Sequence, residues 1–153
     1  MPNTYTQLFV QAVFPVKYRK SLILPEMKHD FFGVIGKEIN KTGCKTYIVN
    51  GTEDHVHLLF GLNPTCSLSD VLKVVKGNSS KWMNDTGILK QQFQWQKGYG
   101  GFSYSKREVN RVYQYILNQE EHHRKRDFFE EYVALLDAHQ VQYEERFLFH
   151  PLI

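Results

Sequence analysis

The stretch His55-Val56-His57-Leu58-Leu59-Phe60 decides the fold of this chain. Its apolar residues form a short continuous run, which is typical of a strand buried on both faces of a sheet. Because side chains two residues apart leave the same face of a strand, the rings of His55 and His57 must project together. Two polar rings are costly to bury unless their nitrogens are bonded, either to neighbouring core groups or to a divalent metal ion. We favour the metal ion, since it would satisfy both rings at once.

Hydrophobic patterning predicts further strands and helices around this strand. A turn-rich tetrapeptide at 51–54 separates it from the preceding strand-like run, which is consistent with a β-hairpin. The order strand-helix-strand-strand-helix-strand is the split βαβ arrangement of ferredoxin-like and RRM-like sheets. The predicted elements are a strand at 5–16, a helix at 25–43, strands at 45–50 and 55–62, a helix at 68–87 and a short fourth strand within 94–104.

Helical patterns continue beyond the fourth strand. Ser105 can cap a third helix, on which Tyr115 and Gln119 lie. Asp127 can cap a final helix rich in apolar residues, and the exposed hydrophobic side of that helix would need a partner surface. We therefore predict an α+β fold, with a ferredoxin-like sheet and additional C-terminal helices that carry the tyrosine.

Composition narrows the class of protein. The chain has 153 residues, of which 42% are hydrophobic, so residues 1–153 are expected to form a single domain around one core. The net charge of +3 is mild and permits an anionic partner without establishing one. Cys44 and Cys66 are isolated and have neither a disulfide-framework nor a zinc-knuckle spacing. Without an export signal or a membrane-spanning run, we expect a cytoplasmic protein.

A spacing of four residues puts Tyr115 and Gln119 on one stripe of the predicted third helix. The side-chain oxygen of Gln119 could add a third ligand to Mg²⁺ or Mn²⁺, although a solvated helix residue is the alternative. A phenol, with a pKa of about 10, is a poor nucleophile unless a base or a cation stabilises it. Attack by Tyr115 on a DNA phosphate would form a phosphotyrosine and free a 3′-hydroxyl. This reaction is transesterification and not hydrolysis.

Neighbouring residues offer rival or supporting roles. Tyr113 lies on a different face of the helix from Tyr115. His122 returns to nearly the same stripe but too far along the helix, so His122 and His123 are expected to contact DNA or solvent. Asp54 could orient an imidazole from behind, although it could equally serve the turn. Basic residues that could grip DNA phosphates are Lys73, Lys76, Lys81, Arg124, Lys125 and Arg126.

These motifs together carry a family resemblance. On His55-Val56-His57, the segment from Tyr115 to Gln119 and the connecting residues 95–103, the chain resembles the single-tyrosine HUH transposases. This is the IS200-like group, which includes the REP-associated tyrosine transposases. The resemblance implies that single-stranded DNA with hairpins is cleaved and rejoined through a 5′-phosphotyrosine. It implies that His55 and His57 are the metal-binding pair. Tyr115 would be the nucleophile and Gln119 the third ligand.

The resemblance also bears on assembly. Members that mobilise insertion sequences work as homodimers in which the tyrosine helix can complete the partner's site, whereas REP-associated relatives can act as monomers. This chain has a longer tail, 138–153, than a minimal transposase of this type requires. The tail could cover the last helix or hold it against a second subunit. We expect a homodimer.

Other functions are compatible with parts of the pattern. A replication-initiator or relaxase-type nickase would share the two histidines and the tyrosine, but the order of the motifs weighs against it. A non-catalytic RRM-like module would present the same sheet to bases, yet the histidine pair does not help such a module. A binding module would retain DNA without divalent ions and leave it intact, whereas a transposase would cleave only with metal. A domesticated REP-type relative could keep the fold and the ligands while losing mobility.

Overall fold

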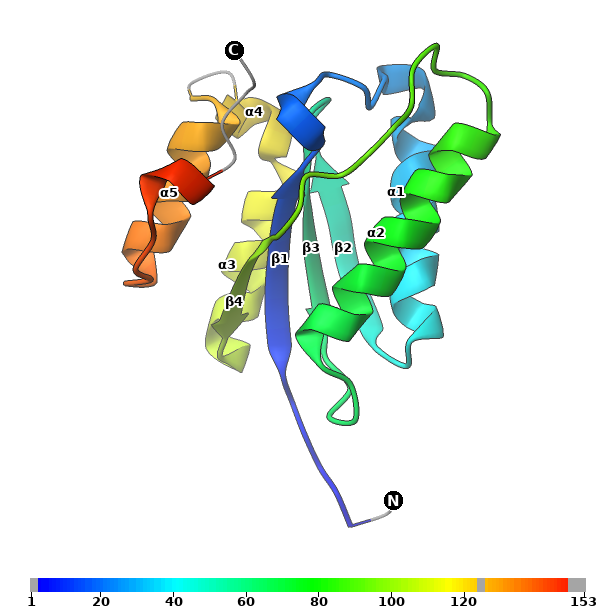
Figure 1. Ribbon diagram of the computed structural model, residues 1–153. Helices are drawn as coiled ribbons and strands as arrows, with labels where there is room; N and C mark the ends of the chain where they lie inside the picture. Colours follow the sequence, from blue (N-terminus) through cyan, green and yellow to red (C-terminus); the bar gives the residue numbers. More distant parts are fainter. Residues whose placement is uncertain (1–2, 124–125, 149–153) are drawn as a thin grey trace.

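The computed structural model describes residues 3–123 and 126–148, and Figure 1 shows how their helices and strands are arranged. Within these residues, the elements follow the predicted order strand-helix-strand-strand-helix-strand, and further helices come after the fourth strand. The strands are β1 (Phe9–Pro15), β2 (Lys45–Gly51), β3 (His55–Gly61) and β4 (Gly100–Tyr104). The helices are α1 (Pro25–Lys41), α2 (Leu68–Asp85), α3 (Lys106–Leu117), α4 (Gln119–His123) and α5 (Phe128–Ala138), with short 3-10 turns η1 (Lys17–Arg19) and η2 (Glu145–Phe147).

The strands form one antiparallel sheet in the order β2-β3-β1-β4. This is the strand order of a split βαβ sheet, so the predicted α+β fold class is confirmed. Helices α1 and α2 cover one face of the sheet, and α3, α4 and α5 lie on the other (Figure 1). The central strand β3 is therefore buried on both faces, which explains its continuous apolar run.

Alternate residues of β3 serve the two layers. Val56, Leu58 and Phe60 pack into the larger core together with side chains of α1 and α2. Leu59 packs on the opposite face, against side chains of α3. The rings of His55 and His57 project to the same face as Leu59, as the two-residue period predicts, and each histidine is 0% exposed.

The first strand is shorter than predicted. The partner strands β3 and β4 end opposite Phe9, at Gly61 and Tyr104 respectively. Leu8 still accepts a backbone hydrogen bond from Leu62, but the residues before it extend beyond the sheet, and Tyr5 is 90% exposed. The β-branched and aromatic composition of this segment suits a strand, but no length of sheet remains for it to pair with.

The predicted third helix is wrong in one respect, because it does not continue to Gln119. Helix α3 ends at Leu117, and Asn118 has non-helical backbone angles (φ −98°, ψ 27°). The Asn50 side-chain amide donates hydrogen bonds to the carbonyl oxygens of Ile116 (2.9 Å) and Leu117 (3.1 Å). In a continuous helix these oxygens would accept from N–H groups four residues further on. The Asn50 side chain of β2 thus takes the place of the backbone N–H groups that would continue the helix, and α4 begins as a separate helix.

Helix α5 begins where the sequence predicts and covers the sheet beside α3. The Asp127 side chain caps it by accepting from the backbone N–H of Glu130 at 2.9 Å. Gly100 allows the close approach of α5, because a Cβ atom there would lie only 2.6 Å from Cε1 of Tyr132. The partner expected for the apolar side of this helix is thus the chain's own sheet. The contact joins Phe128, Tyr132 and Leu136 of α5 to Val13 and Phe102.

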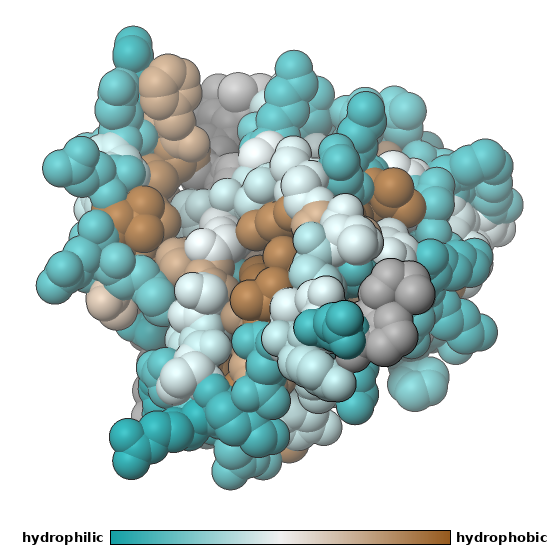
Figure 2. Space-filling view, turned by 90° about the horizontal axis from the view of Figure 1, so that it is seen from below, coloured by the Kyte–Doolittle hydropathy of each residue, from teal (hydrophilic) through white to brown (hydrophobic). Residues whose placement is uncertain are grey.

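The outer surface is mixed in character. Figure 2, which shows the molecule from below, has hydrophobic side chains in the middle of that face and mostly hydrophilic ones around its edge. Among the described residues, no helix is both long enough and apolar enough to cross a membrane.

Candidate active site

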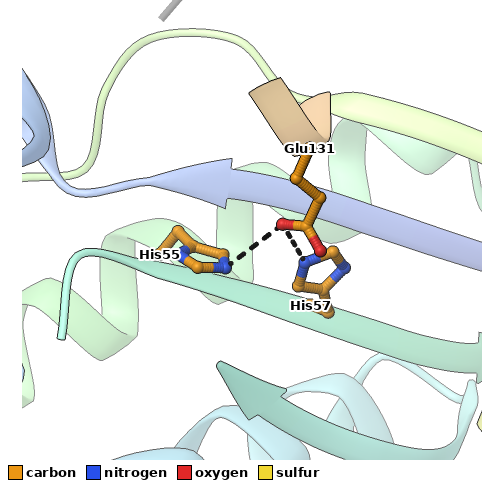
Figure 3. Close-up of side chains that lie close together, drawn as sticks. All are labelled: His55, His57 and Glu131. Carbon is orange, nitrogen blue, oxygen red and sulfur yellow. Dashed lines mark hydrogen bonds and ion pairs between the residues drawn. The ribbon is translucent and has the colours of Figure 1, made fainter. Parts of the chain in front are cut away.

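The two histidines of β3 and a glutamate of α5 meet between the sheet and the helices. Nε2 of His57 lies 3.1 Å from Oε1 of Glu131, and Nε2 of His55 lies 3.5 Å from the same oxygen. Both rings point toward this carboxylate (Figure 3). One side-chain ligand atom from each of the three residues lies within 4.8 Å of the others, and all three residues are buried. This spacing suits a single metal ion between them.

The Nδ1 atom of His55, on the side of the ring away from Glu131, has two hydrogen-bonding partners. Nδ1 lies 2.7 Å from Oδ1 of Asp54 and 2.9 Å from Oγ1 of Thr52. Burial by itself would raise the pKa of Asp54, but the interactions with His55, Thr52 and Arg19 together outweigh burial, and the pKa lies below its usual value. An ionised Asp54 accepts from Nδ1–H and leaves the lone pair of Nε2 directed into the site. The structure thus brings Asp54 into contact with the histidine that it was predicted to orient.

His57 is held by Gln11 of β1, a residue that the sequence reasoning missed. Nε2 of Gln11 lies 3.0 Å from Nδ1 of His57, and Oε1 of Gln11 accepts a hydrogen bond of 2.6 Å from the Tyr104 hydroxyl. In this arrangement Nδ1 is the acceptor, so the ring hydrogen is on Nε2 and points at Glu131. Metal ligation through Nε2 requires the Gln11 amide to turn over and accept from Nδ1–H. A buried glutamine within an apolar strand was the available signal.

Tyr115 and Gln119 reach the site from two successive helices. Gln119 is 0% exposed, and its Oε1 lies 3.0 Å from Nε2 of His55. Its Nε2 donates to Oε2 of Glu131 at 3.0 Å. The Tyr115 hydroxyl donates to the same oxygen, and the Tyr115 ring lies 5.8 Å from the His57 ring between centroids. The structure therefore brings both residues to the histidine pair, even though a helix break separates them.

Glu131 is the residue that connects these groups, and the sequence reasoning did not identify it. Its Oε1 faces the histidines and its Oε2 accepts from Tyr115 and Gln119. Burial by itself would raise its pKa, but the interactions with His57, His123 and His55 together outweigh burial and lower it. The sequence did contain a signal for a buried carboxylate. Glu131 lies on the same stripe of α5 as Phe128 and Tyr132, which are buried.

The two consecutive histidines of α4 also contact the site, which the sequence reasoning did not predict. Nε2 of His123 lies 2.9 Å from Oε1 of Glu131, and the His123 ring lies 4.4 Å from the His55 ring. The His122 ring stacks on Tyr115 at 4.5 Å. Both residues contact the site because the break at Asn118 sets α4 at its own angle. The distance that argued against His122 as a ligand holds for a straight helix, and this helix breaks at Asn118.

The site keeps its phenol and one of its imidazoles uncharged. Burial, followed by the charge and the hydrogen bond of Glu131, raises the pKa of Tyr115 above its usual value. Burial lowers the pKa of His57, although the carboxylate of Glu131 opposes this effect. A neutral imidazole is the form that binds metal ions. Tyr115 therefore needs a nearby proton acceptor before it can act as a nucleophile, and Glu131 is the group that it contacts.

The predicted DNA-binding lysines lie on α2, on the opposite face of the sheet from Tyr115. Lys73 is exposed, and Lys81 forms an ion pair of 2.6 Å with Asp85. The Lys76 ammonium donates to the backbone carbonyls of Gln96 and Gly98, each at 2.7 Å. Burial lowers its pKa to about 8. Among the other basic candidates, Arg126 is exposed near the start of α5, whereas Arg124 and Lys125 lie outside the described residues.

The donor set fits a divalent ion. The outer nitrogen of each histidine is held by a neighbouring side chain, so Nε2 of both rings converges on one point. Oε1 of Gln119 lies 3.0 Å from Nε2 of His55. With the hydrogen of His55 on Nδ1, both of these atoms present a lone pair, and a cation that binds both atoms would remove the repulsion between them. Glu131 adds an anionic oxygen. Nitrogen and oxygen donors of this kind suit a borderline or hard divalent cation.

Comparisons with known proteins agree with this geometry. A family model described as "Transposase IS200 like" matches residues 4–119. The matched segment contains the histidine pair, Tyr115 and Gln119, and it ends before α5 begins. Helix α5 and its Glu131 are thus outside the part of the chain that the family model covers.

Individual relatives match parts of the chain. The ISDra2 transposase TnpA of Deinococcus radiodurans is 27% identical over 77 residues, which are 50% of this chain and 55% of that protein. The match therefore spans about half the length of the curated relative. A crystal structure from Deinococcus radiodurans R1, assigned as a transposase, has a TM-score of 0.63 and 24% identity over 76% of this chain and 94% of that one.

A second solved structure is that of a REP-associated tyrosine transposase bound to a REP hairpin. It has a TM-score of 0.60 and 14% identity, over 79% of this chain and 72% of that chain. At these identities, both solved structures establish a likeness of fold. The predicted membership of the IS200-like group is confirmed by the family model.

Proposed function

Since the chain belongs to the IS200-like transposase family, we propose that it cleaves and rejoins single-stranded DNA through a 5′-phosphotyrosine on Tyr115. One observation carries the proposal. The Tyr115 hydroxyl and the histidine pair share a single carboxylate, Glu131, whose two oxygens face the nucleophile and the metal-binding nitrogens respectively. A nucleophile beside both a proton acceptor and a metal site is the arrangement that phosphoryl transesterification needs.

We propose that Mg²⁺ or Mn²⁺ is the metal. His55, His57 and Gln119 would hold it, with Oε1 of Glu131 as a further ligand. When bound, the ion would polarise the scissile phosphate and balance the charge that develops during attack. Asp54 would hold the His55 ring in the ligating form, and Gln11 would do the same for His57 once its amide has turned over to accept from Nδ1–H.

Glu131 accounts for the proton that leaves Tyr115. Oε2 of Glu131 takes the proton of the Tyr115 hydroxyl as the phenol oxygen attacks phosphorus. A bond forms between the phenol oxygen and phosphorus, and the bond from phosphorus to the 3′-oxygen breaks. The departing 3′-oxygen takes a proton from solvent and becomes a free hydroxyl, while the phenol proton stays on Glu131. Attack by a 3′-hydroxyl on the phosphotyrosine reverses these steps and returns the proton to Tyr115.

The substrate proposal is single-stranded DNA that carries hairpins at the ends of a mobile or repeated element. Its support is the family and the likeness in fold to a transposase bound to a REP hairpin. We also propose that residues 1–153 form a single domain, because the helices on both faces pack on one sheet. A DNA substrate and the free thiols of Cys44 and Cys66 support a cytoplasmic location.

A homodimer was expected from the resemblance, and we propose that any such dimer joins two sites that are each complete. One chain supplies the histidine pair, Tyr115 and Gln119 at contact distance. A mixture of Tyr115→Phe and His57→Ala chains tests this point. It should form no DNA adduct if the sites act in cis, whereas recovery of the adduct would show that the tyrosine acts in trans.

The test of the function is incubation of the full chain with single-stranded, hairpin-bearing DNA from the flanks of its own gene. With Mg²⁺ or Mn²⁺, we expect an adduct on Tyr115, seen by denaturing gel and by peptide mass analysis. Tyr115→Phe should lose the adduct and keep DNA binding. Tyr113→Phe, on the same helix, is the matched control and should keep both.

Three outcomes would contradict the proposal. Full activity of Tyr115→Phe would remove the nucleophile assignment. Tight hairpin binding that needs no metal and yields no adduct would favour the non-catalytic binding module. Hydrolysis without a protein-bound intermediate would exclude the tyrosine mechanism.

A further inference from the structure

A cavity of about 500 Å³ opens beside Tyr115, between α3, β4 and α5. Its volume lies in the range of pockets that hold small organic ligands, about 300–1,000 Å³. Tyr115 and Gln11 contribute to its wall, so the cavity adjoins the candidate active site directly. The side of the cavity formed by α5 includes Ala134, Leu135 and Ala138. These residues lie beyond the segment 4–119 that the family model matches.

One part of the cavity offers aromatic surface. The rings of His139 and Phe102 lie 4.4 Å apart at 31°, and the His139 ring meets Tyr104 at 5.4 Å and 82°. His139 and Tyr104 both line the cavity, and Leu135 adds an aliphatic side chain. Flat aromatic surfaces of this kind accept nucleobases by stacking, whatever the identity of the base.

The lining of the cavity includes two guanidinium groups. Arg111 and Arg126 line it, and a single carboxylate, Glu108, accompanies them. Glu108 is already engaged, because it accepts from the backbone N–H of Ser105 and pairs with Arg111 at 3.2 Å. Arg126 and the nucleophile Tyr115 both line the cavity. A guanidinium in this position suits a phosphate next to the nucleophile.

We propose that this cavity binds one unpaired nucleotide of the cleaved strand, adjacent to the phosphate that Tyr115 attacks. The base lies against Tyr104, His139 and Leu135, and its phosphate is held by Arg126. The proposal rests on the proposed function, since it specifies how the single-stranded substrate is positioned. Helix α5 thus has two roles: it supplies Glu131 to the reacting groups and one wall of the nucleotide pocket.

The experiment measures binding of fluorescent hairpin oligonucleotides with single-stranded arms taken from the flanks of the gene. Divalent ions are left out, so that binding is separated from cleavage. An abasic position is moved along the arm one nucleotide at a time. We expect one position next to the cleavage site to weaken binding by about tenfold, because a stacked base is lost there.

Two protein variants connect that position to the cavity. Ala138→Trp places an indole in the cavity at an exposed helix position, and it should abolish the difference between intact and abasic arms. Val141→Trp, at a residue that is 43% exposed and outside the cavity, is the matched control and should keep the difference. Arg126→Gln should weaken binding of the arm by several-fold, whereas Arg107→Gln, on the outer side of α3, should not.

The outcomes distinguish a failure of the nucleotide pocket from a failure of the proposed function. If every abasic position binds equally, or if Ala138→Trp keeps the position dependence, the nucleotide pocket is wrong. The proposed function survives that result when the parent chain still forms its Tyr115 adduct in a parallel reaction with Mn²⁺. If the parent chain neither binds nor cleaves any hairpin DNA, both proposals are overturned.

Discussion

The Tyr115 hydroxyl donates a hydrogen bond to the carboxylate of Glu131, although the two residues belong to different helices and lie 16 positions apart. The other oxygen of the same carboxylate lies 3.1 Å from Nε2 of His57. Glu131 is therefore a neighbour of both the nucleophile and the metal-binding nitrogens. Its position makes the geometry of α5 part of the proposed catalytic machinery.

Replacing Glu131 by glutamine should slow the formation of the Tyr115 adduct by roughly 10²–10⁴-fold. The amide keeps the shape and hydrogen-bonding capacity of the side chain but cannot take the phenol proton, and general-base catalysis contributes about this factor. Single-turnover kinetics at saturating Mn²⁺ measure the effect. Glu130→Gln, at an exposed position of α5, should leave the rate unchanged. Equal rates for Glu131→Gln and the parent chain would assign proton transfer elsewhere.

Replacing Gln11 by leucine should weaken Mn²⁺ binding by about 10–100-fold, the usual effect of removing a group that orients a metal-bound histidine. Gln11 is 1% exposed and lies 3.0 Å from Nδ1 of His57, so leucine would leave that nitrogen without this partner. Titration calorimetry of the metal alone gives the dissociation constant. Gln114→Leu, at an exposed position of α3, is the control. Unchanged affinity in Gln11→Leu would mean that His57 needs no support from β1.

Replacing Gly100 by alanine should lower the free energy of unfolding by about 1–3 kcal/mol, the typical cost of overpacking a buried contact. The new Cβ atom would lie 2.6 Å from Cε1 of Tyr132, so α5 must shift outward. The same shift should weaken Mn²⁺ binding through Glu131. Gly77→Ala is a contrasting control, because a Cβ there meets nothing within 4 Å and alanine favours the helix. Urea unfolding of the two variants should therefore move in opposite directions.

Replacing Lys76 by methionine should destabilise the fold by about 1–3 kcal/mol, because its ammonium donates to two backbone carbonyl groups. The same change at Lys73, which is exposed one turn earlier on α2, should alter stability by no more than about 0.5 kcal/mol. Thermal and urea unfolding distinguish the two variants. If Lys73→Met is the more destabilising, Lys76 does not anchor the segment that leads into β4.

The stability of the protein should fall in acid partly through Glu38. Hydrogen bonds from Asn78 and Lys41 hold the pKa of Glu38 below its usual value of 4.5. The unfolded chain then binds the proton more readily, so the contribution is complete above pH 4.5 and is lost as the pH falls toward the lower folded pKa. Glu38→Gln should flatten this dependence in urea unfolding between about pH 5 and pH 3. Glu26→Gln, which is exposed on the same helix, should retain the slope of the parent chain.

Much of the architecture follows from local patterns in the sequence. The two-residue period of β3 already puts His55 and His57 on one face, and Asp127 already marks the start of α5. The order of strands and helices follows from hydrophobic spacing, which depends only on neighbours in the chain. For these features each local preference agrees with the final fold, which is why the sequence predicts them.

What the tertiary structure alone decides is which distant residues meet. The sequence treats Tyr115 and Gln119 as neighbours on one helix, but the Asn50 amide ends α3 between them and sets α4 apart. That break brings His123 to the site, and packing of α5 on the sheet brings Glu131. Hydrophobic periodicity reports which side of a helix is buried and not what it is buried against. The histidine pair and the tyrosine could therefore be predicted from the sequence. The carboxylate of Glu131 reaches them only through the packing of α5 on the sheet.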